Sequence, residues 1–468
     1  MCSLNPQQLL LAKRKREAKM QAINTILGRM REKGDQPAIF WENNALSYRN
    51  FCEMIEEWVA RLPETGVGAC SVCAVLSDYS PQTCALFFAL MTRKAIIVPF
   101  TPEIEKDMPD LLPIAGAQHL FRFDRDDNWQ QESLPDAGQN ALVETFRSRQ
   151  SPGLIVFTSG STGKPKGILH DCERVMQKFV AERNGWRTVL FLMMDHFGGF
   201  NTLLSAFTYG GAAVCLPSRS PDDVCAAIAA SGADLLPTTP TFLNLLIASG
   251  VYRSHDLSSI KLITYGTEVM PDATLKKTRE IFPNAKLKQT YGLSELGVLR
   301  SKSESDDSPW VKIGGDGFEV KIIDSTLWVR SQANMIGYLN APNAIDADGW
   351  MCTGDKVQVR GEFMRILGRK SDMINVGGQK VFPLEIENVL LEAENIGEAS
   401  VFAQPHPIMG QVVYAKVSLI QPEDPVMLTE RLRKHCFQRL AKYKVPLRFR
   451  IAATDDLHSD RFKKIRQE

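Results

Sequence analysis

The residues with the clearest chemical potential form the stretch Phe157–Gly167, which reads FTSGSTGKPKG and follows the apolar run 153–156. Its glycines let the backbone turn N–H groups toward a bound anion, its hydroxyls add hydrogen-bond donors, and its lysines add positive charge. A Gly/Ser linker has a similar composition, but the apolar strand that runs straight into this stretch favours a polyphosphate-binding loop. The candidate phosphate-binding residues are Thr158, Ser159, Gly160, Ser161, Thr162, Gly163 and Lys166.

Pro165 distinguishes this loop from a Walker A loop, which has its magnesium-binding Ser or Thr at that position. The stretch is therefore not an ordinary P-loop. We expect a helix to begin near His170, directly after the loop.

A second constellation lies at residues 289–297, which read QTYGLSELG. Tyr291 offers a flat ring that can stack on a purine, and Gly292 allows a ligand to approach the backbone closely. Ser294 can donate to a phosphate, and Glu295 can hold a hard cation such as Mg²⁺. Taken alone, the same string also fits a turn with a buried tyrosine.

A third group of residues contains Gly349, Trp350 and Thr353–Asp355, and residues 337–340 precede it. An ionised aspartate after a Thr-Gly turn offers two acceptor oxygens, which suits the two hydroxyls of a ribose, although Thr-Gly-Asp is also a common turn. Farther on, Gly368–Arg369 precede Gly377–Gly378, which fit the tight turn of a hairpin, and Pro383 fits the first position of a helix.

The order of these motifs resembles that of the adenylate-forming superfamily, which includes acyl- and aryl-CoA synthetases, nonribosomal peptide adenylation domains and firefly luciferase. The resemblance extends from Ala38 to Arg466. It implies that Tyr291 lies in the adenine motif, that Glu295 binds Mg²⁺, and that Asp355 binds the ribose of ATP.

The resemblance implies further nucleotide-binding residues. Gly266, Thr267 and Glu268 match the adenine-wall segment, in which the family more often has a second glycine at the position of Thr267. Arg369 would reach the ribose or a phosphate.

Two features of the C-terminal part also follow from the resemblance. Gly377 and Gly378 would flank a tunnel for the pantetheine thiol. The pivot between the domains would fall at Ser371, where the family usually has Asp or Lys, and a small polar residue can still absorb the backbone rotation.

The tail of the chain, 459–468, would carry the catalytic lysine. The family usually shows Ser/Asn-Gly-Lys-x-x-Arg here, and the register that keeps Arg466 makes Lys463 the catalytic lysine, with Phe462 in place of the glycine. Lys464 is the second candidate.

One reaction fits these residues. A carboxylate attacks the α-phosphorus of ATP, pyrophosphate leaves, and an acyl-adenylate forms, with the barrier lowered by positioning and by cations placed where charge develops. By resemblance, the catalytic residues would be Lys463, Glu295 and Ser294. The small domain would then swing and present the thiol of coenzyme A or of a carrier-protein phosphopantetheine.

The substrate acid is indicated by His196, which matches the histidine of acyl and aryl synthetases, where amino-acid-activating domains have an aspartate. We therefore expect a short, medium-length or aromatic carboxylic acid, held near His196, Asp195 and Gly266. Asp195, where the family is usually apolar, would favour a polar or amino-bearing substrate.

Three alternatives stay open. A standalone adenylation enzyme would load a carrier protein instead of coenzyme A, and a luciferase-like oxygenase shares these motifs. A non-catalytic nucleotide-binding or interaction protein of the same fold would have lost its catalytic residues, and only Phe462 and Ser371 depart in that direction.

Composition is consistent with a small-molecule enzyme. The net charge of +1, from 55 basic and 54 acidic residues, gives no general reason to bind nucleic acid or an anionic membrane. No apolar run is long enough for a transmembrane segment, and the start of the chain lacks a signal peptide. The ten cysteines are scattered without a zinc-site spacing, so we expect free thiols and a cytoplasmic location.

The elements that must position these residues alternate between strands and helices from residue 37 to residue 282, which predicts an α/β fold with a parallel sheet covered on both faces. We expect a large N-terminal domain, 1–367, of layered sheets and helices with a β-rich subdomain, a hinge at 368–371, and a small mobile α+β domain at 372–468. An amphipathic helix is expected within 7–34.

Overall fold

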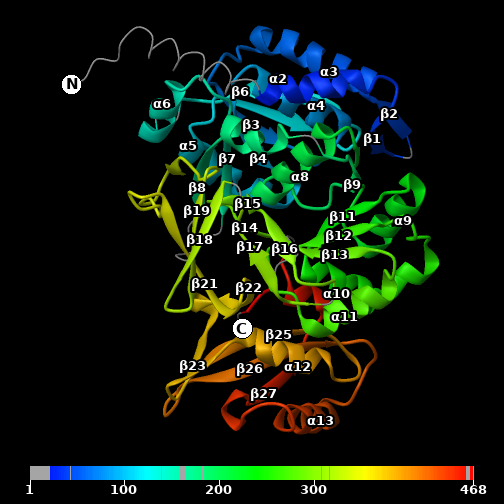
Figure 1. The fold of residues 1–468 in the computed structure, drawn as a ribbon, viewed down its shortest axis with the longest axis vertical. Helices are drawn as coiled ribbons and strands as arrows, with labels where there is room; N and C mark the ends of the chain where they lie inside the picture. The colour runs from blue at the N-terminus through cyan, green and yellow to red at the C-terminus, as the bar shows by residue number, and fades with distance from the viewer. Residues whose placement is uncertain are drawn as a thin grey trace. The chain divides into compact units, whose positions relative to one another are not determined.

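The computed structural model describes residues 22–42, 44–136, 138, 140–158, 165–181, 183–306, 308–315, 317–459 and 464–466. Within these residues the chain forms two compact units. The first unit contains the chain up to Pro217 with Leu293–Val298 and Ser331–Gly349, and the second contains Ser218–Gly292, Leu299–Arg330 and the chain from Trp350. Figure 1 shows both units and labels most of their helices and strands.

The main sheet of the first unit has the strand order β20-β8-β7-β4-β3-β5-β6. Strands β7, β4, β3 and β5 are parallel, whereas β8 and β6 pair antiparallel with their neighbours. The bounds are β3 (Val72–Leu76), β4 (Ile96–Phe100), β5 (His119–Phe123), β6 (Trp129–Ser133), β7 (Gly153–Thr158), β8 (Lys166–Asp171) and β20 (Gly337–Tyr338). The predicted parallel sheet thus forms the centre of a mixed sheet.

Both faces of this sheet are buried. In β3, Cys73 and Val75 join one apolar cluster, which contains residues of α2, α3, α4 and α8, whereas Val72, Ala74 and Leu76 join a second cluster with residues of α5 and α6. Strands that are apolar on both faces are typical of a covered parallel sheet. The helices are α2 (Ala22–Glu32), α3 (Tyr48–Arg61), α4 (Pro81–Thr92), α5 (Met108–Ala115), α6 (Ala141–Arg147), α7 (Cys172–Met176) and α8 (Phe197–Thr208).

A second group of strands in the first unit has the order β9-β10-β1-β2. Strands β1 and β10 and strands β10 and β9 are parallel, and β2 pairs antiparallel with β1. The bounds are β1 (Pro37–Trp41), β2 (Asn44–Ser47), β9 (Arg187–Val189) and β10 (Ala212–Val214).

The second unit begins with a parallel βα segment. Strands β11 (Leu235–Thr238), β12 (Leu262–Tyr265) and β13 (Lys286–Gln289) pair in that order. The helices are α9 (Pro221–Ser231), α10 (Pro240–Ser249) and α11 (Asp272–Ile281). The Thr239 side chain accepts a hydrogen bond from the Phe242 N–H and Pro240 follows at the first position, so the local sequence fixes where α10 begins.

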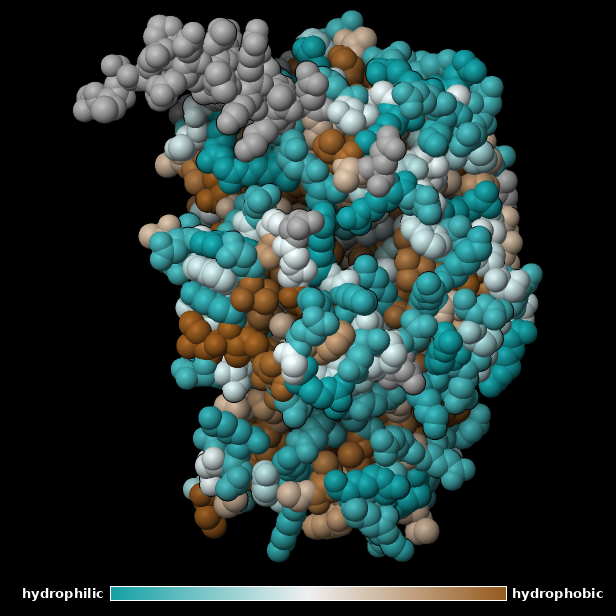
Figure 2. All heavy atoms as spheres, viewed as in Figure 1, coloured by the Kyte–Doolittle hydropathy of each residue, from teal (hydrophilic) through white to brown (hydrophobic). Residues whose placement is uncertain are grey.

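The predicted β-rich subdomain is a six-stranded sheet, β16-β17-β22-β21-β19-β18. Its strands are β16 (Ser301–Ser303), β17 (Val311–Ile313), β18 (Phe318–Ile323), β19 (Thr326–Ser331), β21 (Trp350–Arg360) and β22 (Phe363–Arg369). Hydrophobic side chains gather over β18 and β21 in Figure 2, and the exposed large apolar residues of these two strands are Ile322, Ile323 and Val359. A short two-stranded sheet is formed by β14 (Tyr291–Leu293) and β15 (Gly297–Leu299).

The C-terminal elements form an α+β layer. Strands β24-β23-β26-β25 make a sheet to which β27 adds in parallel beside β26, and the helices α12 and α13 follow in the same part of the chain (Figure 1). Residues of both helices share the apolar cluster of this sheet. The bounds are β23 (Ile374–Val376), β24 (Gln379–Val381), α12 (Pro383–Leu391), β25 (Ile396–His406), β26 (Gly410–Leu419), α13 (Pro425–Phe437) and β27 (Arg448–Ile451). The hairpin at Gly377–Gly378 and the helix start at Pro383 are confirmed.

One local prediction is shifted by two residues, since the helix expected near His170 begins at Cys172, and a second one is wrong. The residues near His170 form strand β8, because Ile168 and Leu169 pair with the apolar strand β7. The helix α7 begins only at Cys172, where the Asp171 side chain accepts hydrogen bonds from N–H groups of its first turn. Thr353–Asp355 lie inside strand β21 rather than in a turn.

The rest of the predicted N-terminal helix, before Ala22, lies outside the described residues. No helix in the described part of the chain is long and apolar enough to cross a membrane. The cysteines of the described ranges are free thiols, of which Cys352 is exposed and the others are buried.

His170 in β8 makes stability depend on pH. Its Nε2 donates to the Ser294 carbonyl at 2.6 Å, and burial lowers the pKa of the imidazole from 6.5 to about 4. A histidine with a lowered folded-state pKa stabilises the fold fully above the unfolded pKa and loses that contribution as the pH falls toward the folded pKa.

We expect the free energy of unfolding to fall by about 2 kcal/mol between pH 7 and pH 5 because of His170 alone. Replacing His170 with Gln keeps an N–H donor but removes the titrating group, so His170→Gln should be less pH-dependent by that amount. Urea unfolding of both proteins at the two pH values measures the difference. An identical pH dependence in both proteins would contradict this account.

Candidate active site

Three predicted nucleotide-binding residues come together in the second unit. The Tyr291 hydroxyl donates to Asp355 Oδ2 at 2.5 Å, and Arg369 Nε lies 3.5 Å from Asp355 Oδ1. They come from β14, β21 and β22, which lie far apart in sequence. An aromatic ring, a carboxylate and a guanidinium are therefore grouped in one place, and these are side chains that can bind an adenine, a ribose and a phosphate.

The Asp355 carboxylate is nearly buried, with 6% of the residue exposed. Burial raises the pKa of Asp355, and the Tyr291 hydroxyl and the Arg369 guanidinium oppose this rise. Gly354 before it has φ +76°, a conformation that favours glycine, and the Thr353 hydroxyl accepts a bond from the Asp355 N–H. The Thr-Gly-Asp motif therefore fixes the direction of a carboxylate inside a strand.

The adenine-wall segment follows β12. A Cβ at Gly266 would lie 2.5 Å from Thr290 Oγ1 and 2.9 Å from the Thr290 carbonyl oxygen, so a larger residue would clash there. Thr267 has φ +69°, which is strained for a β-branched residue and explains why the family more often has glycine there. The Glu268 carboxylate accepts from the Thr241 hydroxyl at 2.5 Å and from the Lys464 N–H at 2.6 Å.

The phosphate loop joins β7 to β8 in the first unit. Thr158 pairs with Lys166 in this hairpin, and the loop residues Ser159, Gly160, Ser161, Thr162 and Gly163 lie outside the described residues. Asn340 holds the far end of the loop, because its side chain donates to the Pro165 carbonyl at 2.9 Å and accepts from the Gly167 N–H at 3.1 Å.

Glu295 of the first unit is held by the Tyr338 hydroxyl, which donates to its Oε1 at 2.8 Å. Burial and the Glu295 charge raise the pKa of Tyr338, so the hydroxyl keeps its proton. Lys166 Nζ lies 5.2 Å from the centre of the Tyr338 ring. Among the described residues no Lys or Arg forms an ion pair with Glu295, which leaves its charge available to a cation.

The remaining residues of the Tyr-Gly motif have backbone roles. Ser294 gives its carbonyl to His170, and Gly292 follows Tyr291 in β14. The Ser294 hydroxyl makes no hydrogen bond to another of the described residues.

Two of the predicted substrate residues lie directly before α8, whereas the third, Gly266, follows β12. His196 is the residue before this helix, and Asp195 beside it is buried, with 2% of the residue exposed. Gly199 in the first turn leaves no room for a side chain, because a Cβ there would lie 1.9 Å from the Met193 carbonyl oxygen.

Lys463, the predicted catalytic lysine, lies outside the described residues. Its neighbour Lys464 is engaged elsewhere, because its Nζ lies 2.9 Å from Glu398 and 3.7 Å from Glu387. Arg466 pairs with Glu387 at 3.0 Å and lies 3.6 Å from Asp372.

In the predicted hinge, Gly368 is half-buried and Ser371 is exposed, as are the thiol-delivery residues Gly377 and Gly378. Ser371 lies in a short 3₁₀ turn, Lys370–Asp372, and its hydroxyl donates to the Asp372 carboxylate at 2.9 Å. Gly377 and Gly378 have φ +57° and +88°, as a tight two-residue hairpin turn requires.

Sequence reasoning did not assign site roles to several residues that hold the site together. They are the partners of Glu295, of the loop and of the tail, namely Tyr338, Asn340, Thr241, Asn244, Glu387 and Glu398. The Gly-Tyr-Leu-Asn string at 337–340 was visible in the sequence, but only the paired strands β8 and β20 bring it beside the loop.

The chain matches the AMP-binding enzyme family over residues 28–339 and the C-terminal domain of AMP-binding enzymes over residues 385–464. It therefore belongs to the AMP-binding enzyme family, which confirms the predicted superfamily. The prediction of an AMP-forming acid–thiol ligase that uses ATP and Mg²⁺ is confirmed with it.

Among similar proteins is the indoleacetate–CoA ligase of Aromatoleum aromaticum, 28% identical over 92% of this chain and 94% of the relative. A 2-succinylbenzoate–CoA ligase of Bacillus pumilus is 25% identical over 92% and 94% of the two chains. The solved structure of an anthranilate CoA ligase in complex with anthranoyl-AMP has a TM-score of 0.78 at 19% identity, covers 92% and 93% of the two chains, and so shares the fold.

Thr267 allows a direct test of the strained adenine-wall segment. Replacing it with glycine should relieve about 1–2 kcal/mol of left-handed backbone strain against a smaller entropic cost, so Thr267→Gly should stabilise the protein by about 1 kcal/mol. Thermal unfolding monitored by calorimetry measures this change.

Thr264→Gly is the matched control, because Thr264 lies in β12 with ordinary strand backbone. It should destabilise the protein. If both variants lose stability equally, Thr267 is not strained.

Proposed function

We propose that this protein is an aryl- or acyl-CoA ligase. It catalyses attack of a carboxylate on the α-phosphorus of ATP, which forms an acyl-adenylate and releases pyrophosphate, and then transfers the acyl group to the thiol of coenzyme A with release of AMP. The observation that carries the proposal is the grouping of Tyr291, Asp355 and Arg369, which offers a nucleotide a ring, a ribose-binding carboxylate and a cation.

Glu295 is the proposed magnesium ligand. The Tyr338 hydroxyl fixes one of its oxygens, and no Lys or Arg of the described ranges neutralises it, so the residue fits a hard cation. Mg²⁺ would neutralise charge on the phosphates. Around them, Thr158 and Lys166 at the ends of the phosphate loop, the loop residues between them and Ser294 would supply donors and positive charge.

Lys463 is the proposed catalytic cation, which would bridge the substrate carboxylate and the α-phosphate. The surroundings of Lys464 support the choice of Lys463 over Lys464 as the catalytic lysine. The Lys464 ammonium is compensated by Glu387 and Glu398, and its side chain is only 6% exposed. Holding two reacting groups with one cation lowers the barrier through orientation and through charge stabilisation.

The proposed substrate is an aromatic or arylalkyl carboxylic acid bound near His196, Asp195 and Gly266. Two similar ligases are named for indoleacetate and 2-succinylbenzoate, which are aromatic acids. Asp195 is buried beside His196, so a polar substituent on the substrate would have a partner.

The second step is proposed to require rotation about 368–371, which separates a large domain, 1–367, from a small domain, 372–468. Ser371 is exposed in its short turn, where backbone rotation breaks little packing. Gly377 and Gly378 would then flank the path of the pantetheine thiol. A cytoplasmic location stays a prediction from the scattered cysteines.

The first test is carboxylate-dependent exchange of labelled pyrophosphate into ATP over a panel of aryl, short aliphatic and α-amino acids. We expect exchange with an aryl acid, and Lys463→Ala should lower it by about 100-fold or more, because a charge-stabilising group is lost. Lys434→Ala, which removes an exposed lysine of α13, is the matched control and should leave exchange unchanged.

Each of the other outcomes would indicate a different class of protein. Exchange with the acid but thioester formation only on a carrier protein would identify a standalone adenylation enzyme. Neither exchange with any acid nor measurable ATP binding would identify a non-catalytic protein of the same fold.

A further inference from the structure

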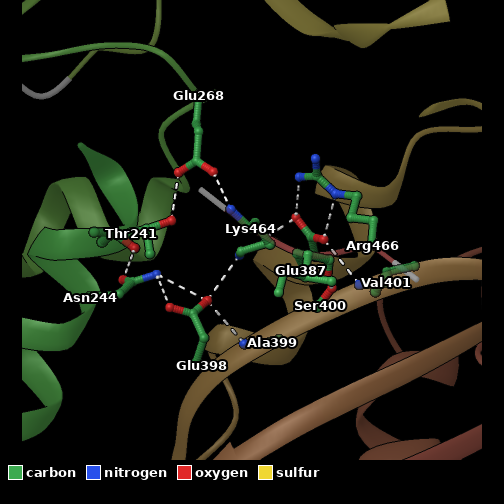
Figure 3. A network of polar contacts seen from close by, with 12 residues as sticks. Thr241, Asn244, Glu268, Glu387, Glu398, Ala399, Ser400, Val401, Lys464 and Arg466 are labelled. Carbon is green, nitrogen blue, oxygen red and sulfur yellow. Dashed lines mark hydrogen bonds and ion pairs between the residues drawn. The ribbon is translucent and has the colours of Figure 1, made fainter. Parts of the chain in front are cut away.

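The last described residues of the chain, Lys464–Arg466, are bound by a buried ionic network (Figure 3). Lys464 Nζ lies between the carboxylates of Glu398 and Glu387, which have 1% and 0% of their surface exposed. The Ser400 hydroxyl donates to the carbonyl of Ile465 at 2.5 Å. The tail is therefore fixed to α12 and β25.

The charges of this network depend on one another. Arg466 makes two hydrogen bonds to Glu387, at 3.0 and 3.1 Å, and Lys464 is the only cation within ion-pair distance of Glu398 among the described residues. Although burial alone would lower the pKa of Lys464, Glu387 and Glu398 raise it, so the ammonium stays charged. Removing one partner would leave an uncompensated buried charge.

Two contacts connect this network to residues outside 372–466. The Asn244 amide of α10 donates to both oxygens of Glu398, at 3.3 and 3.4 Å, and the Lys464 N–H donates to Glu268 at 2.6 Å. Asn244 is itself oriented by the Thr274 hydroxyl of α11, which donates to its Oδ1. Figure 3 shows Asn244 and Glu268 on one side of Lys464 and Glu387 on the other.

We propose that Asn244, Glu398 and Lys464 are positioning residues for acyl-adenylate formation, whose contacts hold Lys464, the residue after the proposed catalytic lysine, against Glu268 of the adenine-wall segment. We name these three residues the tail clamp. This inference rests on the proposed function, because it assigns the clamp to the first of the two half-reactions.

The contacts of the tail clamp fall into two sets. One set persists when the small domain rotates, and the other must break. The bonds of Lys464 to Glu387 and Glu398 lie wholly within 372–466, so they would move with the small domain. The bonds to Asn244 and Glu268 would break when that domain rotates. Hydrogen bonds to carboxylates contribute modestly, so this set can break during turnover while the ionic set persists.

The clamp therefore favours adenylation and opposes thiol transfer. A variant that weakens only the Asn244–Glu398 contact should slow the first half-reaction and leave the second unchanged or faster. A residue with a purely structural role would lower both together, and the split between the half-reactions separates the two roles.

The test uses Asn244→Asp, which is nearly isosteric and places a second carboxylate against Glu398. We expect pyrophosphate exchange to fall by about tenfold or more, as for loss of a hydrogen bond to a charged group. Thioester formation from supplied acyl-adenylate and coenzyme A should fall by less than about twofold, and this retained activity also shows that the variant folds.

A double variant tests the contact itself. Combining Asn244→Asp with Glu398→Gln restores an amide–carboxylate pair in the opposite direction, and it should recover part of the lost exchange. Asn395→Gly is the matched control, because Asn395 makes a similar bond to Glu423 at 3.0 Å wholly inside the C-terminal part, at a φ of +64° that glycine accepts. It should leave both half-reactions unchanged.

The outcomes are distinguishable from a failure of the proposed function. Two results would overturn the tail clamp and leave the proposed ligase function intact. In the first, Asn244→Asp exchanges pyrophosphate as well as the wild-type protein does. In the second, the rates of both half-reactions fall together in this variant. If the wild-type protein exchanges pyrophosphate with no acid, the proposed function falls and the clamp falls with it.

Discussion

Compensation of buried carboxylates is the constraint on which the second unit depends. Asp355 is removed from water and is held by the hydroxyl of Tyr291 and the guanidinium of Arg369. Glu387 and Glu398 are removed from water as well and are held by cations from the last residues of the chain. Since a buried charge without a partner is strongly unfavourable, each carboxylate fixes the place of residues distant in sequence.

The first unit uses apolar burial for the same purpose. A sheet that is buried on both faces positions the ends of the phosphate loop, and the Asn340 side chain then binds the backbone on the far side of that loop. Tyr338, two residues before Asn340, fixes Glu295. A rigid scaffold with a few polar side chains at its edge is a common way to support a binding loop.

Much of the fold and of the site follows from the sequence, for physical reasons. Apolar strands and capped helices such as α4 and α10 are local features, so their bounds can be read to within one or two residues. The motif of Tyr291 could be recognised because its residue types and spacing resemble those of the family's nucleotide-binding motif. The strand at His170 could not be predicted in this way, because it exists only through its pairing with β7.

The ionic network around Lys464 could not be predicted from the sequence either. Lys464 looks like a solvated basic residue beside Lys463, and only the packing of α12 and β25 supplies the two carboxylates that bury it. In the same way, Thr267 stood out only as a departure from a pattern. Its positive φ gives the departure a physical meaning.

The one exposed cysteine among the described thiols has a practical consequence. Cys352 lies in β21, three residues before Asp355, whereas the thiols buried in the cores have pKa values raised by burial, Cys225 to about 11 and Cys436 to about 12. Thiolates are the species that react with alkylating dyes, so labelling of these residues would favour Cys352. A fluorophore there would sit in the strand that carries Asp355, the proposed ribose-binding carboxylate, and it would report the proposed nucleotide binding as an optical signal without any engineered residue.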